Sequence, residues 1–582
     1  MLKEIAGYLG KYKKDVCMSP FAMVGEVVCE MLIPVLMGKL VDNGIYAGNT
    51  SYVLHLGVWM LLVAVAGFFS GCAGSYFASK TAAGLSKNLR RAMFVNIQKF
   101  SFSNIDHFST AGLVTRLTTD VTNIQNACQM ILRGALRVPA MIITAMVLSF
   151  LLSPRLALIY LVAVLLLGGF MFLTMSSASK CFRRVYARYD ALNESVEENV
   201  SAMRVVKAYV REDHETTRFQ KASADICLLF QEAELRLSWN TPVSNAAIYC
   251  CILLISWIGA HMIVQDSLTT GALMSLLTYC MNIMQSILFL AMIVVTMTMS
   301  EASAKRILEV IAEKPSITSK EDAVTEVKDG SVDFENVTFS YRDDAKEPVL
   351  KNVTLHIRSG ETIGILGGTG SAKTSLVNLI SRLYDVSDGS VKVGGVDVRD
   401  YDTTALRKSV SVVLQKNVLF SGTIYDNLRW GDKTASNEAC QRAAETACAD
   451  EFIKSFPDGY NTWIEQGGSN VSGGQKQRLC IARALLLHPK VLIFDDSTSA
   501  VDTATEAKIR RNLRETMPDV TKLVIAQRIS SVKECDRILV LDSGTISGFD
   551  THEKLLAHNE IYREVCESQL GMADDADFDP KR

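Results

Sequence analysis

Four long stretches of the sequence contain no aspartate, glutamate, lysine or arginine, and this feature constrains the fold most strongly. They cover residues 53–77, 156–179, 237–265 and 267–300. A helix that crosses the hydrocarbon core of a bilayer needs roughly 20 consecutive apolar residues, so each stretch is long enough to do so. The two remaining predicted spans are 16–38, which contains Glu26 and Glu30, and 138–152, which can extend backward as a helix. We therefore predict six membrane-spanning helices, the last of which continues beyond the membrane.

The basic residues of the connecting segments predict how these helices are oriented. Lysine and arginine are frequent after the second and fourth spans, whereas the connections on the other side are short and contain Asp42, Arg155 and Asp266. Cytoplasmic loops of membrane proteins carry an excess of lysine and arginine. We therefore expect a multi-pass protein with both termini in the cytoplasm.

From about residue 332 the sequence changes to the pattern of a soluble α/β domain. The segment "VDFENVTFSY" alternates like a strand, while "TIGILGG" and "VLIFDD" are short apolar runs typical of buried parallel strands. A polar segment interrupted by Pro315 separates this half from the membrane helices. The formal net charge of −2 does not favour nucleic acid as a partner. The 14 cysteines show neither zinc-ligand spacing nor a disulfide pattern.

The segment "TIGILGGTGSAKTSLVNLISRLYDV" has the order strand, glycine-rich turn and helix, which a phosphate-binding loop requires. Glycines let backbone N–H groups approach phosphate oxygens, and the dipole of the following helix favours an anion. We expect Lys373 to reach the β- and γ-phosphates of a nucleotide and the Thr374 hydroxyl to ligate Mg²⁺. Ala372 stands where such loops usually have glycine, and its one extra methyl group should preserve binding or weaken it. The loop residues are Gly367, Gly368, Thr369, Gly370, Ser371, Ala372, Lys373, Thr374 and Ser375.

Further segments carry residue types suited to nucleotide chemistry. The apolar strand in "KVLIFDDSTSAVD" ends in acids, so Asp495 can hold Mg²⁺ through water. The segment "NVSGGQKQRLCIARAL" opens a helix with a Ser-Gly-Gly-Gln turn, which is a second group of backbone N–H donors suited to a phosphate. Candidate residues in three other segments are Gln415 in "SVVLQKNVLF", Tyr341 in "FSYRDD" and Gln527 at the end of the strand "LVIAQ".

Together these motifs resemble the nucleotide-binding domain of ATP-binding-cassette transporters, and six helices ahead of one such domain resemble an exporter-type half-transporter. The resemblance covers nearly the whole chain, and "VSGGQKQRLCIARAL" is a highly specific segment. It implies that Tyr341 stacks on adenine, that Gln415 is the Q-loop glutamine with a role in catalysis and metal binding, and that Asp502 is the D-loop aspartate. The signature motif corresponds to Ser472, Gly473, Gly474 and Gln475.

The fold class implied by the resemblance is a polytopic α-helical membrane domain followed by an α/β P-loop nucleotide-binding domain. Coupling loops are expected on the cytoplasmic side, after the second and fourth helices. In this family two nucleotide-binding domains pack head to tail, so that each ATP lies between the Walker motifs of one chain and the signature of the other. The predicted boundaries are 1–312 for the membrane domain, 313–330 for the linker, 331–570 for the nucleotide-binding domain and 571–582 for a polar tail.

Two residues depart from the catalytic pattern of the family. Asp496 stands where glutamate usually polarises the attacking water, and Gln527 stands where histidine usually contacts the γ-phosphate. Aspartate is shorter by one methylene, and a displacement of about 1 Å can cost roughly 100-fold in rate; glutamine cannot carry a positive charge. With Ala372 these changes fall in one half-site, while the signature is intact. The pattern resembles the degenerate-site subunit of heterodimeric multidrug exporters, whose partner supplies glutamate and histidine; the alternative is an active homodimer.

We expect the complex to use MgATP to export amphipathic compounds, such as drug-like molecules, lipids or peptides, across a plasma membrane of the bacterial inner-membrane type. An ATP-gated channel or regulator, and an importer on the same scaffold, are the alternatives from other functional classes.

Glu26 and Glu30 lie four residues apart and therefore on one face of the first helix. Ionisable residues inside a membrane are costly and often functional. Either the two glutamates line a cavity that attracts cationic cargo, or they are structural carboxylates bonded to Arg133 or Arg137.

Overall fold

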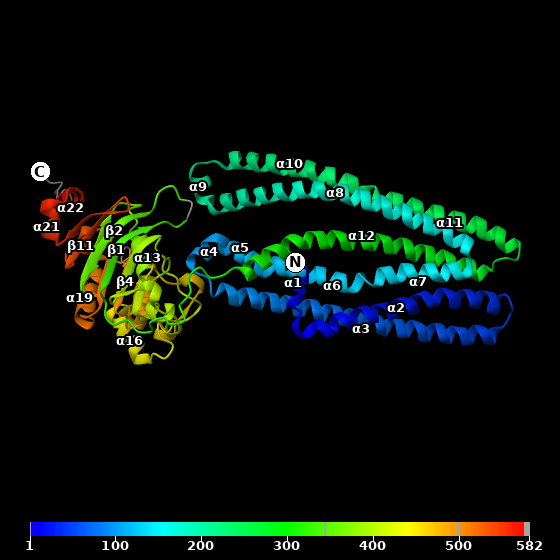
Figure 1. Cartoon of the computed structure of the whole chain (residues 1–582), viewed down its shortest axis with the longest axis horizontal. Coiled ribbons are helices and arrows are strands. Elements are labelled where there is room, and N and C mark those ends of the chain that lie inside the picture. Colours follow the sequence, from blue (N-terminus) through cyan, green and yellow to red (C-terminus); the bar gives the residue numbers. More distant parts are fainter. Residues whose placement is uncertain (1, 343–344, 497–500, 575–582) are drawn as a thin grey trace. The chain divides into compact units, whose positions relative to one another are not determined.

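The computed structural model describes residues 2–342, 345–496 and 501–574. The chain divides into two compact units, each built from two segments of the sequence (Figure 1). The helical unit comprises residues 1–98 and 110–313, and the α/β unit comprises residues 99–109 and 314–582. Because 99–109 follows the second span, part of a predicted coupling loop folds with the α/β unit.

Within the described ranges, the helical unit contains six stretches of helix that are long and apolar enough to cross a membrane, which confirms the predicted number. These stretches are Gly10–Ile45, Thr50–Ile97, Thr110–Leu152, Pro154–Ala178, Glu212–Val264 and Thr270–Val294. The α-helices of the unit are α1 (Leu2–Gly7), α2 (Lys13–Leu40), α3 (Thr50–Ile97), α5 (Thr110–Thr115), α6 (Val121–Gly134), α7 (Arg137–Leu152), α8 (Pro154–Ser201), α9 (Met203–Ala208), α10 (Glu212–Ser238), α11 (Asn240–Val264) and α12 (Thr270–Ala312). Helix α12 continues well beyond its apolar stretch as one long helix.

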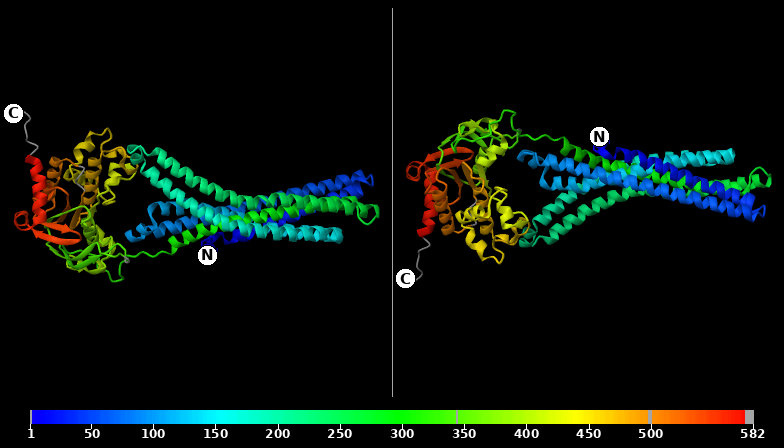
Figure 2. Two further views of the ribbon diagram at one scale, coloured as in Figure 1. Left: turned by 90° about the horizontal axis from the view of Figure 1, so that it is seen from above. Right: turned by 90° about the horizontal axis from the view of Figure 1, so that it is seen from below.

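The long helices of this unit run alongside one another, and α8 and α10 form a pair that diverges from the others toward α9 (Figures 1 and 2). The rings of Phe182 in α8 and Phe230 in α10 meet edge to face, with centroids 5.8 Å apart. Arg236 of α10 donates a hydrogen bond of 2.9 Å to the hydroxyl of Ser177 in α8. Apolar and polar contacts thus both hold the pair together.

Helices α2 and α3 pack closely because glycines of α3 face α2. A Cβ atom at Gly74 would lie 2.5 Å from Cε of Met23, and a Cβ atom at Gly71 would lie 2.9 Å from the carboxyl carbon of Glu26. The Ser19 hydroxyl of α2 donates to the carbonyl oxygen of Gly74 at 2.9 Å. Small residues and polar hydrogen bonds are the usual basis of helix association in a membrane. This packing places the Glu26 carboxylate against the backbone of α3.

The third span is broken between α6, which ends at Gly134, and α7, which begins at Arg137. Pro139 has no N–H group to donate to the carbonyl oxygen of Ala135, so a helical hydrogen bond is missing at the break. Helix α12 approaches closely here, since a Cβ atom at Gly134 would lie 2.4 Å from Cδ1 of Ile293. The backward extension predicted for this span therefore exists, but as a separate helix.

Among its described residues, the α/β unit contains a six-stranded sheet in the order β12-β11-β3-β10-β9-β6, a four-stranded sheet in the order β2-β1-β4-β5 and the pair β7-β8. The strands are β1 (Val332–Phe339), β2 (Leu350–Ile357), β3 (Thr362–Gly367), β4 (Asp388–Val393), β5 (Val396–Asp397), β6 (Val410–Val413), β7 (Gly422–Thr423), β8 (Trp463–Ile464), β9 (Val491–Asp495), β10 (Thr521–Ile525), β11 (Arg537–Asp542) and β12 (Thr545–Asp550). From β11 to β6 the neighbouring strands of the large sheet are parallel. Every residue of β9 and β10 is buried, as expected of continuous apolar runs in a parallel sheet.

The carboxyl ends of β3, β10, β9 and β6 meet at one edge of this sheet because the strands are parallel, and ligands of α/β sheets bind at such edges.

The helices of the unit are α4 (Phe102–Phe108), α13 (Lys373–Ile380), α14 (Thr403–Ser409), α15 (Ile424–Leu428), α16 (Asn437–Thr446), α17 (Asp450–Ser455), α18 (Gly473–Leu485), α19 (Thr503–Thr516), α20 (Ile529–Val532), α21 (His552–His558) and α22 (Glu560–Asp574). The predicted tail from residue 571 begins inside α22, and its part after residue 574 lies outside the described residues.

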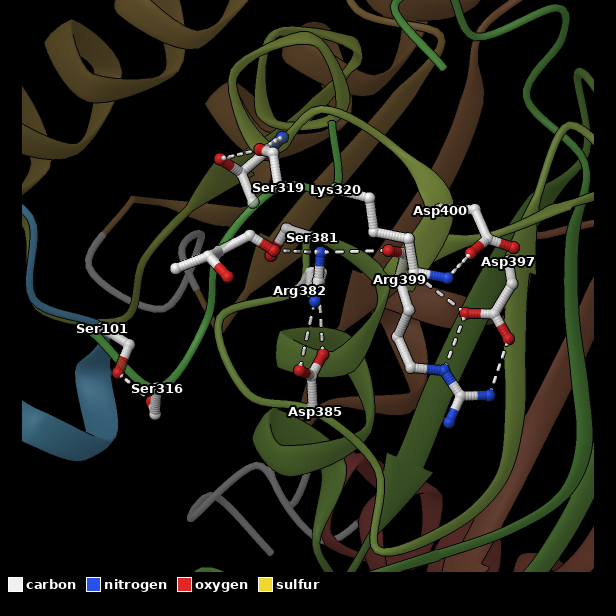
Figure 3. A network of polar contacts seen from close by, with 12 residues as sticks. Ser101, Ser316, Ser319, Lys320, Ser381, Arg382, Asp385, Asp397, Arg399 and Asp400 are labelled. Carbon is white, nitrogen blue, oxygen red and sulfur yellow. Dashed lines mark hydrogen bonds and ion pairs between the residues drawn. The ribbon is translucent and has the colours of Figure 1, made fainter. Parts of the chain in front are cut away.

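Helix α4 is attached inside the α/β unit by polar contacts from two directions. The hydroxyl of Ser101, just before α4, contacts the hydroxyl of Ser316 in the linker (Figure 3). The Tyr384 hydroxyl, which follows α13, donates to Oδ2 of Asp106 in α4 at 2.7 Å. The coupling segment and the linker are thus parts of one packed unit.

Candidate nucleotide-binding site

The predicted phosphate loop connects β3 to α13. Strand β3 ends at Gly367, where a Cβ atom would lie 2.4 Å from the carbonyl oxygen of Leu541 and would clash with it. Gly370 has a φ of +84° and Ala372 a φ of +72°. Glycine adopts this left-handed region freely, whereas alanine pays roughly 1–2 kcal/mol in strain. The loop therefore makes the turn expected of glycine-rich sequence, with one strained residue at its end.

The Lys373 ammonium group is folded over the loop. Its Nζ donates to the carbonyl oxygens of Gly367 and Gly368, both at 2.8 Å. Burial lowers the pKa of Lys373, while the nearby carboxylates of Asp496 and Asp495 act in the opposite direction. The amine is thus held by neutral carbonyl oxygens, which an anion entering the loop can replace.

Helix α13 begins without a side-chain cap, because Ala372 at its N-cap position has no side-chain oxygen. The first N–H groups of a helix need partners from outside the helix, and the helix dipole favours an anion at this end. In the loop, Thr369 is exposed, whereas Ser371 and Ser375 are buried. This uncapped helix end suits a phosphate group.

Side-chain oxygens that could ligate a metal ion lie close together at the end of β9. The Thr374 hydroxyl donates to Oδ1 of Asp495 at 2.8 Å. Burial raises the pKa of Asp495; the Thr374 hydrogen bond lowers it, and the charge of Asp496 raises it further. Gln415 is exposed just beyond β6, which pairs in parallel with β9, so it lies at the same edge of the sheet. Hydroxyl, carboxylate and amide oxygens are ligands suited to Mg²⁺, so these residues fit the expected metal.

The two residues that depart from the family pattern are in contact with each other. Nε2 of Gln527 donates to Oδ2 of Asp496 at 3.0 Å. Strands β9 and β10 pair with Asp495 opposite Ile525, which brings the residues after both strands together. Asp496 has a φ of +47°, and such strained conformations are concentrated at functional sites. The sequence indicates both residues but not the bond between them, because the bond depends on strand pairing.

Tyr341 lies beside the first turn of α13. Its hydroxyl shares a hydrogen bond of 2.8 Å with the Ser375 hydroxyl, and its ring meets the Tyr384 ring edge to face at 5.0 Å. Tyr341 is 44% exposed, so part of its ring remains accessible to a planar base. Since Tyr384 also donates to Asp106, a chain of contacts connects α13 with α4. The sequence motifs do not single out Tyr384, which is marked in the sequence by its place directly after the phosphate-loop helix.

The signature residues lie at the start of another helix, α18. The Ser472 hydroxyl accepts from the N–H group of Gln475 at 3.3 Å, and Oε1 of Gln475 accepts from the N–H group of Ser472 at 2.9 Å. Gly473 and Gly474 form the first turn. This reciprocal capping box satisfies two backbone donors and fixes the start of the helix.

Most of the predicted site residues lie in one cluster, whereas the signature residues and Asp502 lie elsewhere in the unit. The cluster contains the phosphate loop with Asp495, Asp496 and Gln527. Asp502 caps α19 instead, accepting from the N–H group of Thr505 at 2.9 Å. In the part of the chain that the structure describes, no hydrogen bond or ion pair joins the signature residues or Asp502 to the phosphate loop. A single chain therefore assembles the Walker side of a site and keeps its signature apart.

Comparisons with known proteins agree with this architecture. Residues 16–299 match the family model "ABC transporter transmembrane region", and residues 350–499 match "ABC transporter". The chain is 34% identical over 570 residues to the ABC transporter ATP-binding protein YfiB of Bacillus subtilis, covering 98% of this chain and 99% of the relative. It is 33% identical over 574 residues to the ABC transporter ATP-binding protein Rv1273c of Mycobacterium tuberculosis, covering 98% of each.

Among solved structures, a bacterial Atm1-family ABC exporter with ATP bound is similar to this chain with a TM-score of 0.82 and 23% identity, covering 96% of this chain and 99% of that one. This likeness supports the fold. The family models and the relatives cover both halves of the chain. The chain therefore belongs to the ABC transporter family, as a half-transporter in which a six-helix membrane domain is fused to an ATP-binding ATPase domain.

Proposed function

We propose that this chain is the weakly hydrolytic subunit of a heterodimeric exporter. It binds MgATP in its own Walker half-site, hydrolyses it slowly, and contributes an intact signature motif to the active site of its partner. The observation that carries this proposal is the hydrogen bond of 3.0 Å from Gln527 to Asp496.

The hydrogen bond joins the two groups on which hydrolysis depends. Asp496 holds the position from which a carboxylate polarises the attacking water, yet its oxygen already accepts from a neutral amide. Because aspartate is one methylene shorter than glutamate, the carboxylate is displaced, and a displacement of about 1 Å costs roughly 100-fold in rate. Gln527 carries no positive charge, so it stabilises the charge that develops on the γ-phosphate less well than a histidine does. Both effects slow the chemical step and spare nucleotide binding.

Binding depends on other residues of the site. Lys373 exchanges its carbonyl partners for the β- and γ-phosphates, and Tyr341 supplies a ring for the adenine. Thr374 and Asp495 hold Mg²⁺, with Gln415 as a further oxygen donor from the next strand. When bound, Mg²⁺ neutralises charge on the phosphates. These residues are the expected family types, and they converge on one edge of the sheet.

The intact signature indicates what the chain contributes to its partner. ABC half-transporters dimerise, and the residues from Ser472 to Gln475 lie apart from the phosphate loop of their own chain. They therefore serve a phosphate held by the other subunit. The proposed partner is a different half-transporter with glutamate and histidine at the positions that match Asp496 and Gln527.

The proposed cargo is an amphipathic compound of the multidrug type, moved across a plasma membrane with both termini of the chain in the cytoplasm. ATP-dependent accumulation of cargo in inverted membrane vesicles tests this direction of transport. A channel or regulator would not concentrate cargo, and an importer would empty such vesicles.

The decisive experiment measures MgATP binding and hydrolysis on the same sample of the chain, purified alone in lipid nanodiscs. We expect binding with little turnover. The double variant Asp496→Glu, Gln527→His should raise turnover by at least roughly 10-fold, because it restores the carboxylate position and the positive charge, and it should leave the affinity for ATP unchanged.

The matched control is Asp496→Asn, which keeps the shape of the side chain and removes its charge. It should lower whatever turnover the wild-type chain retains. Rapid hydrolysis by the wild-type chain alone would instead establish an active homodimer and refute the proposal.

A further inference from the structure

A cavity in the helical unit lies next to the break between α6 and α7. It has a volume of about 510 Å³, within the range of roughly 300–1,000 Å³ typical of small-molecule sites. We call it the polar cavity. Its polar lining consists of Glu26 from α2, Asn126, Gln129 and Arg133 from α6, and Arg137 from α7.

The negative charge of the polar cavity is concentrated in one cluster. Arg137 pairs with Glu30 at 3.0 Å and with Glu26 at 3.6 Å. Two carboxylates thus share one guanidinium, which leaves one formal negative charge in excess. The structural pairing considered for these glutamates is present, and Glu26 lines the cavity as well.

Arg133 supplies the opposite charge. It lies in the last turn of α6, where the helix dipole favours a cation, and it lines the polar cavity. Among the described residues it has neither a hydrogen-bond partner nor an ion-pair partner. The Arg133 side chain is exposed, so a ligand can reach its guanidinium, and ionisable residues of membrane-spanning segments are often functional. The polar cavity therefore offers a free cation at Arg133 and an excess of negative charge near Glu26.

We propose that the polar cavity binds the head group of a zwitterionic amphiphile, which is the transported compound. A phosphate or carboxylate of the ligand pairs with Arg133, and its ammonium group pairs with the carboxylate of Glu26. Three apolar side chains complete the lining and contact the apolar part of the ligand: Met23, Met130 and Phe289.

A zwitterion fits this arrangement better than a ligand of one charge. A purely anionic ligand leaves the excess negative charge near Glu26 unpaired, and a purely cationic ligand leaves Arg133 unpaired. Charged groups removed from water are tolerated only when they are paired. Glu26 and Glu30 alone suggest a cationic cargo, whereas the same glutamates together with Arg133 favour a zwitterionic one. This inference rests on the proposed export of amphipathic compounds.

The test is ligand binding to the full chain without nucleotide, so that its failure leaves the proposal for the ATP site untouched. The protein is kept in the neutral detergent dodecyl maltoside, because phosphatidylcholine in a nanodisc would compete. Three probes with the same alkyl chain are compared by native mass spectrometry: dodecylphosphocholine, dodecyl phosphate and dodecyltrimethylammonium. We expect the zwitterion to bind at least about 10-fold more tightly than either singly charged probe, since it adds one charge-assisted contact.

Variants of Arg133 and Glu26 test which residue binds the anionic group of the ligand and which binds its ammonium group. Arg133→Gln should weaken binding of dodecylphosphocholine by roughly 10- to 100-fold, and Arg133→Lys should restore most of it. Glu26→Gln should reduce the preference for the zwitterion over dodecyl phosphate. The matched controls are Arg155→Gln and Glu301→Gln, which make the same charge changes at exposed residues outside the cavity and should have no effect.

Competition identifies the source of the zwitterion. Displacement of dodecylphosphocholine by lysophosphatidylethanolamine is expected for a membrane-derived ligand, and displacement by the dipeptide Leu-Phe is expected for a soluble one. Displacement by neither contradicts zwitterion recognition. Equal binding of the three alkyl probes also overturns the proposal. So does an Arg133→Gln variant that binds normally or that changes the oligomeric state instead, since Arg133 would then pair with the partner subunit.

Discussion

Two helices of the α/β unit, α13 and α18, begin at residues proposed to contact nucleotides, and their N-termini differ in how they are capped. Helix α18 is capped by its own side chains, with Ser472 and Gln475 bonded reciprocally to each other's backbone. Helix α13 has no side-chain cap; Ala372 precedes it in a left-handed conformation, and Lys373 covers the loop instead.

The difference indicates how each helix end acquires its ligand. In the proposed site, the uncapped N–H groups at the start of α13 are left for the phosphate that its own loop binds. In the proposed head-to-tail dimer the signature helix serves a nucleotide held by the partner, and its capping box fixes its geometry before that nucleotide arrives. The proposed slow hydrolysis at the chain's own site is therefore compatible with a complete signature for the proposed partner.

A negative charge on the signature helix should have the largest effect. Gly473→Asp places a carboxylate where the partner's γ-phosphate must lie, and such like-charge contact costs several kcal/mol, or more than about 100-fold. Turnover by the two-chain complex should be lost. Folding should be preserved because an acid near a helix N-terminus is favourable. Gly473→Ala adds bulk without charge and should retain much more activity; full turnover by the Asp variant would disprove the head-to-tail arrangement.

Removing the Lys373 amine at the start of α13 should weaken ATP binding by this chain and not turnover at the partner's site. Lys373→Ala should weaken ATP binding at its own half-site by roughly 100-fold, because charge-assisted hydrogen bonds to the phosphates are lost. Photolabelling with an azido-ATP analogue measures this binding. Lys351→Ala is the control: the half-buried Lys351 forms an ion pair with Glu347 at 3.1 Å, and surface pairs of this kind contribute little. Unchanged labelling of the Lys373 variant would refute the phosphate-loop assignment.

The capping box itself is testable by a smaller change. Ser472→Ala should cost about 1 kcal/mol of stability, measured by thermal unfolding, and it should also lower turnover at the partner's site. Ser436 caps α16 in the same manner, accepting from the N–H group of Ala439 at 3.2 Å. Ser436→Ala should therefore cost the same stability and leave turnover unchanged. Equal turnover in both variants would mean that the cap serves stability alone.

The smallest effect is expected at Ala372. Ala372→Gly removes the strain of a φ of +72°, worth roughly 1–2 kcal/mol, but glycine gains freedom in the unfolded state worth about 0.4–1 kcal/mol. The net change in unfolding free energy should be zero to about 1.6 kcal/mol in the stabilising direction. Ala439→Gly, at a half-buried helical alanine, should instead destabilise by about 1 kcal/mol. A similar loss at both positions would show that Ala372 carries no strain.

The sequence predicts the parts of this molecule that depend on local pattern. Uncharged apolar runs predict the spans, and the strand-loop-helix order around Lys373 follows from apolar residues, glycines and a helical pattern in one short segment. Ala372 is recognisable as a departure, but its left-handed conformation is visible only in the structure.

Features that depend on distant pairing are not predictable in this way. Gln527 and Asp496 are 31 positions apart, and only the parallel pairing of β9 with β10 brings them into contact. The sharing of Arg137 by two glutamates depends on how α2 packs beside α7. The sequence offers Arg133 and Arg137 as equal partners for those glutamates, and packing leaves one of them free.

The division of the chain into two units has a mechanical consequence. Because residues 99–109 fold with the α/β unit, the chain passes between the units at residues 98–99, 109–110 and 313–314. A unit joined to the rest of the protein by one covalent connection can rotate freely about it. A unit joined by three connections cannot rotate about one of them without pulling on the other two. Rotation of the ATPase part is thereby converted into tension at the ends of α3, α5 and α12. The covalent route of the chain thus limits free rotation of the α/β unit.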